Sequence, residues 1–284
     1  MAHVRLAFSP DSDDIFMFWP LLHKQVSWGE HTFEHVRADT QALNELAERE
    51  GADVVAVSIA TYPRIRDRYL LLPHGGSVGR GYGPALVAKT ALALGELAGR
   101  KVGVPGLGTT AYLVLRAVAP SFEPVVLPIS PYRRVFDALD AGEVEAALVI
   151  HEGRLHVADR GLYEIADLGR AWAEHTGGLP LPLGGNAIRR GLGAEVVADV
   201  SARLKASVAW ALEHRGQLID ELLSAETRGD VALDRARLDR YLAMYANGDT
   251  LGYPPDAREA CQRLVDEGAR LGVFPAGGAI EWAP

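Results

Sequence analysis

Three reactive side chains stand together directly after an apolar run in the middle of the chain. Residues 147–150 (Ala-Leu-Val-Ile) have the composition of a buried strand, and His151, Glu152 and Arg154 follow with only Gly153 among them. The ordinary pKa of histidine is about 6.5, so a neutral imidazole can accept a proton at physiological pH. A strand that ends at a ligand cleft would therefore present His151 as a general base. The alternative is a histidine with a structural role only.

The neighbours of this histidine have more than one possible role. Successive strand residues point to opposite faces, so His151 and Glu152 can meet one ligand only if the strand has ended. Arg154 could share the side of Glu152 only after Gly153 bends the chain. Glu152 and Arg154 could each orient the base, hold two parts of the protein together or bind a substrate group, and the sequence leaves this choice open.

A second group of polar residues lies where a strand gives way to a helix near the N-terminus. The segment 9–16 (SPDSDDIF) contains Asp11, Asp13 and Asp14. An aspartate at a helix start can be an N-cap, because the first N–H groups of a helix have no partner within it. Three acids in four positions exceed what one cap requires. We therefore expect at least one of them, with Asp14 as the candidate, to contact the ligand or the facing lobe.

The segment 106–110 (GLGTT) lies at another junction of strand and helix. A glycine such as Gly108 lets the backbone approach a ligand, and Thr109 and Thr110 add hydroxyls to the N–H groups of the helix start. No lysine follows as in a Walker loop, and the spacing is not that of a dinucleotide-binding motif. The pattern favours a bound carboxylate; the alternative is that a threonine only caps the helix.

Two glycine-rich segments are candidates for crossings between domains. Segment 74–84 (HGGSVGRGYGP) has glycines around Arg80, a pattern typical of a hinge or of an anion-binding nest. We favour a hinge, with Arg80 either in a structural salt bridge or against the ligand. Residues 181–186 (LPLGGN) predict the return crossing, because prolines and glycines interrupt a helix.

The composition disfavours several classes of function. The formal net charge of −8 argues against nucleic acid and anionic membrane surfaces as partners. No apolar run is long enough to span a bilayer and residues 1–14 lack signal-peptide features, so we expect a cytoplasmic protein. The lone Cys261 excludes a multi-thiolate metal site, the histidine spacings do not suit zinc, and no G-x-S-x-G elbow indicates a serine hydrolase.

The elements that must position these residues alternate between strand-like runs and amphipathic helices. One helix is expected to begin with Thr40 as N-cap and to stop at Gly51. The alternation predicts two α/β lobes, each with a mainly parallel sheet flanked by helices, and a ligand cleft between them. We expect residues 1–88 and 187–284 to form the first lobe, with a helical C-terminal part, and residues 89–186 to form an inserted second lobe.

These segments resemble, in the same order, the signatures of the 1,4-dihydroxy-6-naphthoate synthase family of the futalosine route to menaquinone. The resemblance covers most of the chain and is weakest in the helical C-terminal third. The segments that carry it are SPDSDDIF, VSIATYP, GGSVGRGYGPALVA, VGVPGLGTTAYLVLR, GEVEAALVIHEGR, LPLPLGGNAIRR and MYANGDTL.

The resemblance implies a type II periplasmic-binding-protein fold used for catalysis in the cytoplasm, and we expect neither a cofactor nor a metal. The implied reaction converts cyclic de-hypoxanthine futalosine to 1,4-dihydroxy-6-naphthoate, as loss of the ribose-derived part aromatises the ring system. The histidine of the family's HEGR motif, here His151, is regarded as the base. The paired threonines of the family correspond to Thr109 and Thr110, and the serine of its S-x-x-x-x-P segment to Ser58, as substrate-binding residues.

One motif departs from the family pattern. The family's SPCPNDTF is SPDSDDIF in this chain, so a cysteine and an asparagine are replaced by Asp11 and Asp13. The added negative charge would repel an anionic substrate unless Arg80 or Arg154 offsets it. The alternatives are a chorismate dehydratase-like enzyme of the same pathway and a non-catalytic protein that binds a small carboxylate.

Overall fold

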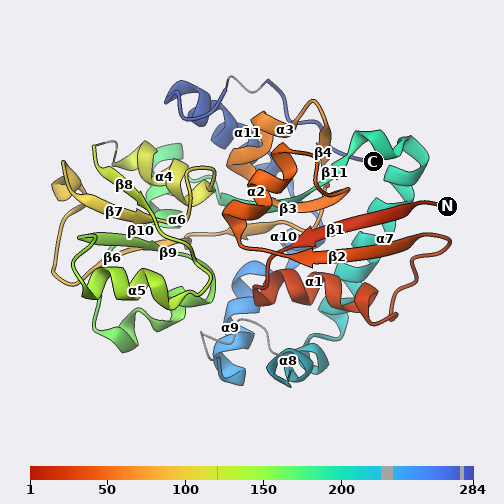
Figure 1. Cartoon of the computed structure of the whole chain (residues 1–284), viewed down its shortest axis with the longest axis horizontal. Coiled ribbons are helices and arrows are strands. Elements are labelled where there is room, and N and C mark those ends of the chain that lie inside the picture. Colours follow the sequence, from red (N-terminus) through yellow and green to blue (C-terminus); the bar gives the residue numbers. More distant parts are fainter. Residues whose placement is uncertain (120, 225–232, 276–277) are drawn as a thin grey trace.

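The protein consists of two α/β lobes that lie side by side, each built on one sheet (Figure 1). The computed structural model describes residues 1–119, 121–224, 233–275 and 278–284. The second lobe is formed by the middle of the chain, and the C-terminal helices return to pack on the first lobe. The expectation of a two-lobed α/β fold is confirmed.

The first lobe holds a sheet with its apolar strands at the centre. Its strands are β1 (His3–Phe8), β2 (Thr32–Arg37), β3 (Val54–Ser58), β4 (Tyr69–Leu71), β5 (Ser77–Gly79) and β11 (Leu181–Arg189). The order is β2-β1-β3-β11-β4, and β5 pairs with β11. The central strand β3, with the sequence VVAVS, is buried along most of its length. Its carboxyl end therefore lies deep in the protein, where it carries Ser58.

The second lobe repeats this plan with a smaller sheet. Its strands are β6 (Ala85–Ala88), β7 (Lys101–Val104), β8 (Glu123–Val126), β9 (Ala146–Val149) and β10 (Tyr163–Asp167), in the order β10-β6-β9-β7-β8. Every residue of β9 is buried, as its apolar sequence predicts. The strand ends at Val149, and after Ile150 the chain enters the short 3₁₀ helix η3 (His151–His156).

Helices cover both sheets and form most of the described C-terminal part of the first lobe. Those of the first lobe are α1 (Ser12–Leu22), α2 (Thr40–Glu48), α3 (Tyr62–Ile65), α7 (Ala194–Glu213), α8 (Arg215–Ser224), α9 (Arg235–Tyr245), α10 (Gly248–Leu251) and α11 (Pro255–Arg270). Those of the second are α4 (Thr110–Val118), α5 (Arg133–Asp140) and α6 (Leu168–Thr176). Helix α1 packs on α7, where the Ser207 hydroxyl donates to the Met17 carbonyl at 2.7 Å. Within the described ranges, no helix is both long and apolar enough to cross a bilayer.

Most strands of each sheet run in one direction, as predicted, and one strand in each sheet runs against the rest. Strands β1, β2 and β3 are parallel, as are β7, β8 and β9, whereas β11 runs antiparallel to β3, β4 and β5, and β6 runs antiparallel to β9 and β10. The reversed strands β6 and β11 are those that the chain enters after it passes from one lobe to the other, which the alternation of strands and helices does not reveal.

The segment 181–186 is not an irregular crossing, contrary to the sequence prediction. It forms most of β11, which pairs with β3, β4 and β5 and so fills the middle of the first sheet. Its proline was the misleading residue: the pairing of β11 with β5 shifts register between Pro182 and Gly184, and such an irregularity accommodates a residue without an N–H.

The predicted lobe boundary at 88/89 falls directly after β6, and the one at 186/187 falls inside β11. The chain leaves the first sheet after β5 and enters the second at β6, and it returns between α6 and β11. Glycines on the outward crossing serve close packing: a Cβ on Gly83 would lie 2.7 Å from the backbone nitrogen of Gly169, and one on Gly169 would lie 2.1 Å from the Tyr82 carbonyl. This stretch therefore presses directly on the start of α6.

Replacement of Gly169 by alanine is expected to destabilise the protein by about 1–3 kcal/mol, because the added methyl group meets backbone that cannot rotate away. Gly216→Ala is the matched control, since Gly216 lies at an exposed position of α8 with no atom near its Cβ position. That substitution should leave the free energy of unfolding unchanged or raise it slightly. Urea unfolding measures both variants, and equal stability of Gly169→Ala and wild type would refute the close packing.

Candidate active site

A cavity lies between the two lobes and brings together most of the predicted site residues. Its lining includes His151, Arg154, Thr109 and Thr110 from the second lobe and Ser58 and Asp14 from the first. Gly108 lies beside this lining and Arg80 lies apart from it. The remaining wall is largely apolar, with Leu43, Val57, Ile150 and Leu183 among its residues. The cavity therefore suits a ligand that combines an apolar ring system with a few polar groups.

His151 occupies the position that the sequence predicts, at the end of a buried strand and on the cavity wall. Its backbone has φ +50°, a left-handed conformation that is rare for residues other than glycine. The side chain is 21% exposed. Its Nδ1 atom lies 3.3 Å from the Asp11 carboxylate, and its Nε2 atom lies 3.1 Å from the Thr40 hydroxyl. The imidazole thus bridges the two lobes, since Asp11 and Thr40 both belong to the first.

Tyr132 of the second lobe forms hydrogen bonds with the backbone directly after β9. The Tyr132 hydroxyl donates to the carbonyl of Ile150 at 2.6 Å and accepts from its N–H at 2.8 Å. Gly153 packs against the same ring, because a Cβ at that position would lie 2.1 Å from it. Tyr132 therefore satisfies the last backbone groups before His151, where the strand can no longer do so.

The sequence left the roles of Glu152 and Arg154 open, and the structure shows which groups each of them contacts. Glu152 is 1% exposed, and its carboxylate accepts the backbone N–H of Ser12 at 2.7 Å. It therefore links the second lobe to the start of α1. Arg154 lines the cavity while its guanidinium donates to the Gly83 carbonyl and to the Asp167 carboxylate.

The hydroxyls at the start of α4 are engaged with the protein itself. Thr109 caps the helix, since its hydroxyl accepts the N–H of Tyr112 at 3.2 Å and donates to the Gly106 carbonyl at 2.8 Å. The Thr110 hydroxyl donates to the Leu183 carbonyl at 2.7 Å. These bonds fix the two threonines on the cavity wall, as required of groups that hold a ligand in one orientation.

The neighbouring positions are held in the same manner. The Ser58 hydroxyl accepts from the Asn44 amide at 3.2 Å. The N–H of Gly108 donates to the side chain of Gln41 at 3.0 Å, and its carbonyl accepts from the Thr61 hydroxyl at 2.8 Å. Gly108 thereby anchors the loop to the first lobe.

Two carboxyl groups at the first turn of α1 lie beside the cavity, that of Asp13 buried and that of Asp14 half-buried. Asp13 accepts hydrogen bonds from the Tyr241 and Ser77 hydroxyls, both at 2.9 Å, and Asp14 accepts the N–H of Ser9 at 2.7 Å. Burial, together with the charge of nearby acids, raises the pKa of Asp13 to about 7 and the pKa of Asp14 to about 7. Near neutral pH this pair therefore carries less negative charge than two exposed aspartates would.

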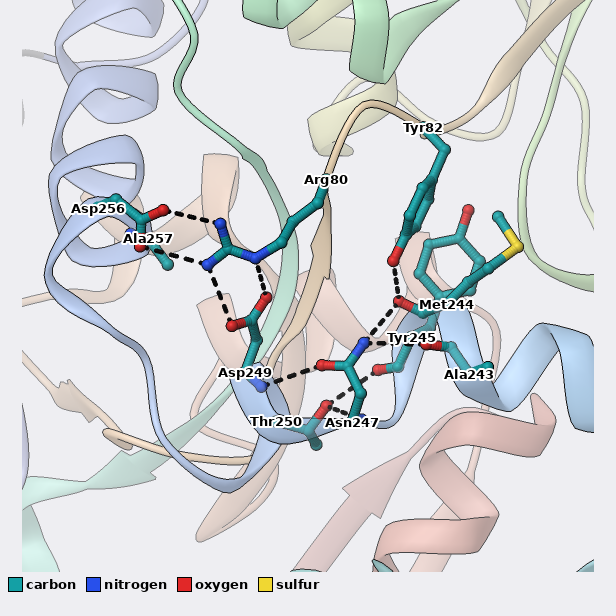
Figure 2. Close-up of polar contacts among 10 residues, drawn as sticks. All are labelled: Arg80, Tyr82, Ala243, Met244, Tyr245, Asn247, Asp249, Thr250, Asp256 and Ala257. Atoms are coloured by element: carbon teal, nitrogen blue, oxygen red, sulfur yellow. Dashed lines mark hydrogen bonds and ion pairs between the residues drawn. The ribbon is translucent and has the colours of Figure 1, made fainter.

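Arg80 forms an ion-pair cluster outside the cavity (Figure 2). Its guanidinium donates to the carboxylates of Asp249 and Asp256, in each case at 2.7 Å for the shorter bond. Two residues further on, the Tyr82 hydroxyl donates to the Met244 carbonyl at 2.6 Å. The contacts fit the predicted salt bridge rather than a ligand clamp, and they attach the outward crossing to α9, α10 and α11.

Three cavity residues were missed by the sequence reasoning. Thr40 was expected to cap α2, but the Asp39 side chain caps it instead, which leaves the Thr40 hydroxyl beside His151. Tyr241 and Tyr245 line the cavity from α9. Their spacing of four residues places both on one face of a helix and is the signal that could have found them. In the described part of the chain, no group of three or more acidic, histidine or cysteine side chains is placed to hold a metal.

Comparison with known proteins places the chain in a family. A family model described as menaquinone biosynthesis matches residues 4–270. A protein of Thermus thermophilus named 1,4-dihydroxy-6-naphthoate synthase is 36% identical over 274 residues, which are 96% of each chain. A Streptomyces coelicolor protein of the same name is 35% identical over 289 residues, covering 97% of this chain and 96% of that protein.

Solved structures show which known proteins share this fold. The crystal structure of an Archaeoglobus fulgidus protein has a TM-score of 0.87 and 38% identity, covering 96% of this chain and 98% of that one. The alkanesulfonate-binding protein of Xanthomonas axonopodis pv. citri, solved bound to MOPS, has a TM-score of 0.72 at 16% identity over 99% of this chain and 96% of its own, a likeness of fold alone. The chain therefore has the two-lobed fold of periplasmic binding proteins and belongs to the menaquinone-biosynthesis family that includes the 1,4-dihydroxy-6-naphthoate synthases.

Proposed function

We propose that the protein is a carbon–carbon lyase that converts cyclic de-hypoxanthine futalosine to 1,4-dihydroxy-6-naphthoate, with His151 as the general base. The observation that carries the proposal is the placement of His151 at a cavity between the lobes of a chain whose relatives bear that synthase name. The partly apolar wall suits the ring system of the substrate.

The proposed reaction requires few catalytic groups from the protein. Nε2 of His151 takes a hydroxyl proton from the ribose-derived part, and the electron pair of that O–H bond forms a carbonyl there as the carbon–carbon bond to the ring system breaks. The electron pair of the broken bond passes into the ring system, which takes up the proton, and the ribose-derived part leaves as a carbonyl compound. Aromatisation of the remaining rings drives the reaction forward. The protein must then mainly orient the substrate, exclude water and stabilise the developing negative charge.

The start of α4 is the proposed site for the substrate carboxylate. Helix α4 begins at Thr110, and Thr109, Thr110 and Ala111 line the cavity together with Ser58 of the first lobe. A helix start favours an anion through its N–H groups and its partial positive charge. Arg154 adds positive charge on the same wall, and the raised pKa values of Asp13 and Asp14 reduce the repulsion that two ionised carboxylates would exert on an anion.

Replacement of His151 by asparagine is expected to lower kcat by about 100-fold or more, because the general base is lost. Asparagine is chosen because it tolerates the left-handed backbone that His151 adopts. Binding of the substrate, measured by calorimetry, should remain close to that of wild type. His156→Asn is the control, since His156 lies on the same 3₁₀ helix outside the cavity lining. Near-wild-type turnover of His151→Asn would refute the role of base.

The buried acids predict a specific dependence of stability on pH. Because the folded-state pKa values of Asp13 and Asp14 are about 7, above an unfolded value of about 4, the folded protein binds more protons between these limits. The free energy of unfolding contributed by these groups is therefore present at low pH and falls as pH rises from about 4 to about 7.

Asp14→Asn should accordingly lose less stability than wild type between pH 4.5 and pH 8, because one of the two carboxyls no longer titrates. Urea unfolding at both pH values measures the difference. Asp67→Asn is the control, since the Asp67 side chain is 90% exposed and its replacement should leave the pH dependence as in wild type. An unchanged pH dependence in Asp14→Asn would contradict the proposed burial effect.

A further inference from the structure

We propose that Asp11 is the positioning residue of His151: its carboxylate, which belongs to the opposite lobe, keeps the imidazole proton on Nδ1 and leaves Nε2 as the basic atom. The inference rests on the proposed function, since it concerns the same base. The inference assigns a role to Asp11, one of the positions at which the chain departs from the family's first motif. The resemblance places a cysteine at this position.

The contact itself determines which nitrogen carries the proton. Nδ1 of His151 lies 3.3 Å from Oδ2 of Asp11. A neutral imidazole has one N–H, and a nitrogen lone pair that faced a carboxylate at this distance would be repelled by it. The tautomer with hydrogen on Nδ1 is therefore favoured. Nε2 then presents its lone pair to the Thr40 hydroxyl at 3.1 Å, on the cavity wall.

Asp11 is built into the start of α1 without serving the helix as a cap. It holds the N-cap position, yet among the described residues its side chain gives the helix no capping hydrogen bond. Its backbone is fixed on both sides, because its N–H donates to the Ser9 hydroxyl at 3.1 Å and its carbonyl accepts from Ile15 at 3.0 Å. The residue is fully buried. The carboxylate is therefore held in place against the histidine that it faces, as a group that orients an imidazole must be.

The other charged groups around His151 have different principal partners. On its own element, Glu152 accepts from the backbone of Ser12, and Arg154 is bound to Asp167. On α1, Asp13 accepts from two hydroxyls and Asp14 from a backbone N–H.

Two tyrosines face the same region from α9. Burial raises the pKa values of Tyr241 and Tyr245, so both rings stay neutral at physiological pH. Thr40 of α2 has no charge. The Asp11 carboxylate lies 3.3 Å from the ring of His151, and its charge is expected to raise the proton affinity of that ring.

The arrangement also couples the base to the closed state of the cavity. Asp11 belongs to the first lobe and His151 to the second, and the adjacent contact of Glu152 with Ser12 joins the same two segments. Separation of the lobes would remove the carboxylate from the imidazole. The base would then be fully oriented only while the substrate is enclosed.

The test compares Asp11→Asn with wild type in two independent measurements. Asparagine keeps the size of the side chain and removes its charge. The proton affinity of His151, followed by an NMR titration of the ring and assigned with His151→Asn, should fall about tenfold or more when the carboxylate is lost. The kcat should fall about 10- to 100-fold with KM little changed, and the acidic limb of the pH–rate profile should move to lower pH. Asp11→Glu, which restores the charge on a longer arm, should recover part of both effects and serves if Asp11→Asn does not fold.

The control for the charge change is Asp159→Asn. Asp159 lies 3.9 Å from His156, so its replacement should alter the titration of His156 and leave both His151 and turnover as in wild type. An unchanged titration of His151 in Asp11→Asn overturns the inference, and so does an altered titration with unchanged kcat. Failure of the proposed function gives a different result. Near-wild-type turnover of His151→Asn would refute the role of His151 as general base, whereas the NMR titration would still show whether Asp11 changes the proton affinity of the His151 ring.

Discussion

The left-handed backbone at His151 is the constraint on which the rest of the site depends. A residue other than glycine in this conformation costs about 1 kcal/mol or more and persists only where its surroundings enforce it. Here Tyr132 ties down both backbone groups of Ile150 on one side, and Gly153 packs against the same tyrosine ring on the other. The chain must therefore turn sharply at His151. Its imidazole then leaves the sheet of the second lobe and meets Asp11 and Thr40 of the first.

The same turn explains how a protein with a net charge of −8 can line its cavity with acids. Each carboxyl group at the start of α1 has its own partner: Asp11 lies against His151, Asp13 accepts from hydroxyls, and Asp14 accepts from a backbone N–H. Glu152 lies on the partner lobe and accepts another N–H of the same helix start. Helix starts favour anions, so the acids support the junction of the lobes, and the raised pKa values of Asp13 and Asp14 limit the charge that an anionic substrate meets.

Much of this organisation could be predicted from the sequence, because it depends on local patterns. The apolar run of β9 places His151 at a strand end, and the loop before α4 places Thr109 and Thr110 at a helix start. The failures concern partners that are distant in the chain. Thr40 was not recognised as a cavity residue because it was predicted to be the N-cap of α2. Asp39 and Thr40 are both good capping residues, and only the tertiary structure shows that Asp39 is the cap. The strand β11 was not recognised because it contains a proline and two glycines, and the partners of Arg80 lie about 170 residues further on. No local pattern encodes such contacts.

In the proposed function, the cavity between the lobes, with its oriented imidazole, performs a carbon–carbon cleavage on a cyclic futalosine derivative. Incubation of the purified protein with cyclic de-hypoxanthine futalosine, followed by mass spectrometry of the products, tests this reaction itself. We expect 1,4-dihydroxy-6-naphthoate in equal amount to the substrate consumed, together with the ribose-derived fragment. Quantitative recovery of the substrate, in the presence of a protein that binds it, would refute the proposed catalysis and would indicate a binding protein in place of an enzyme.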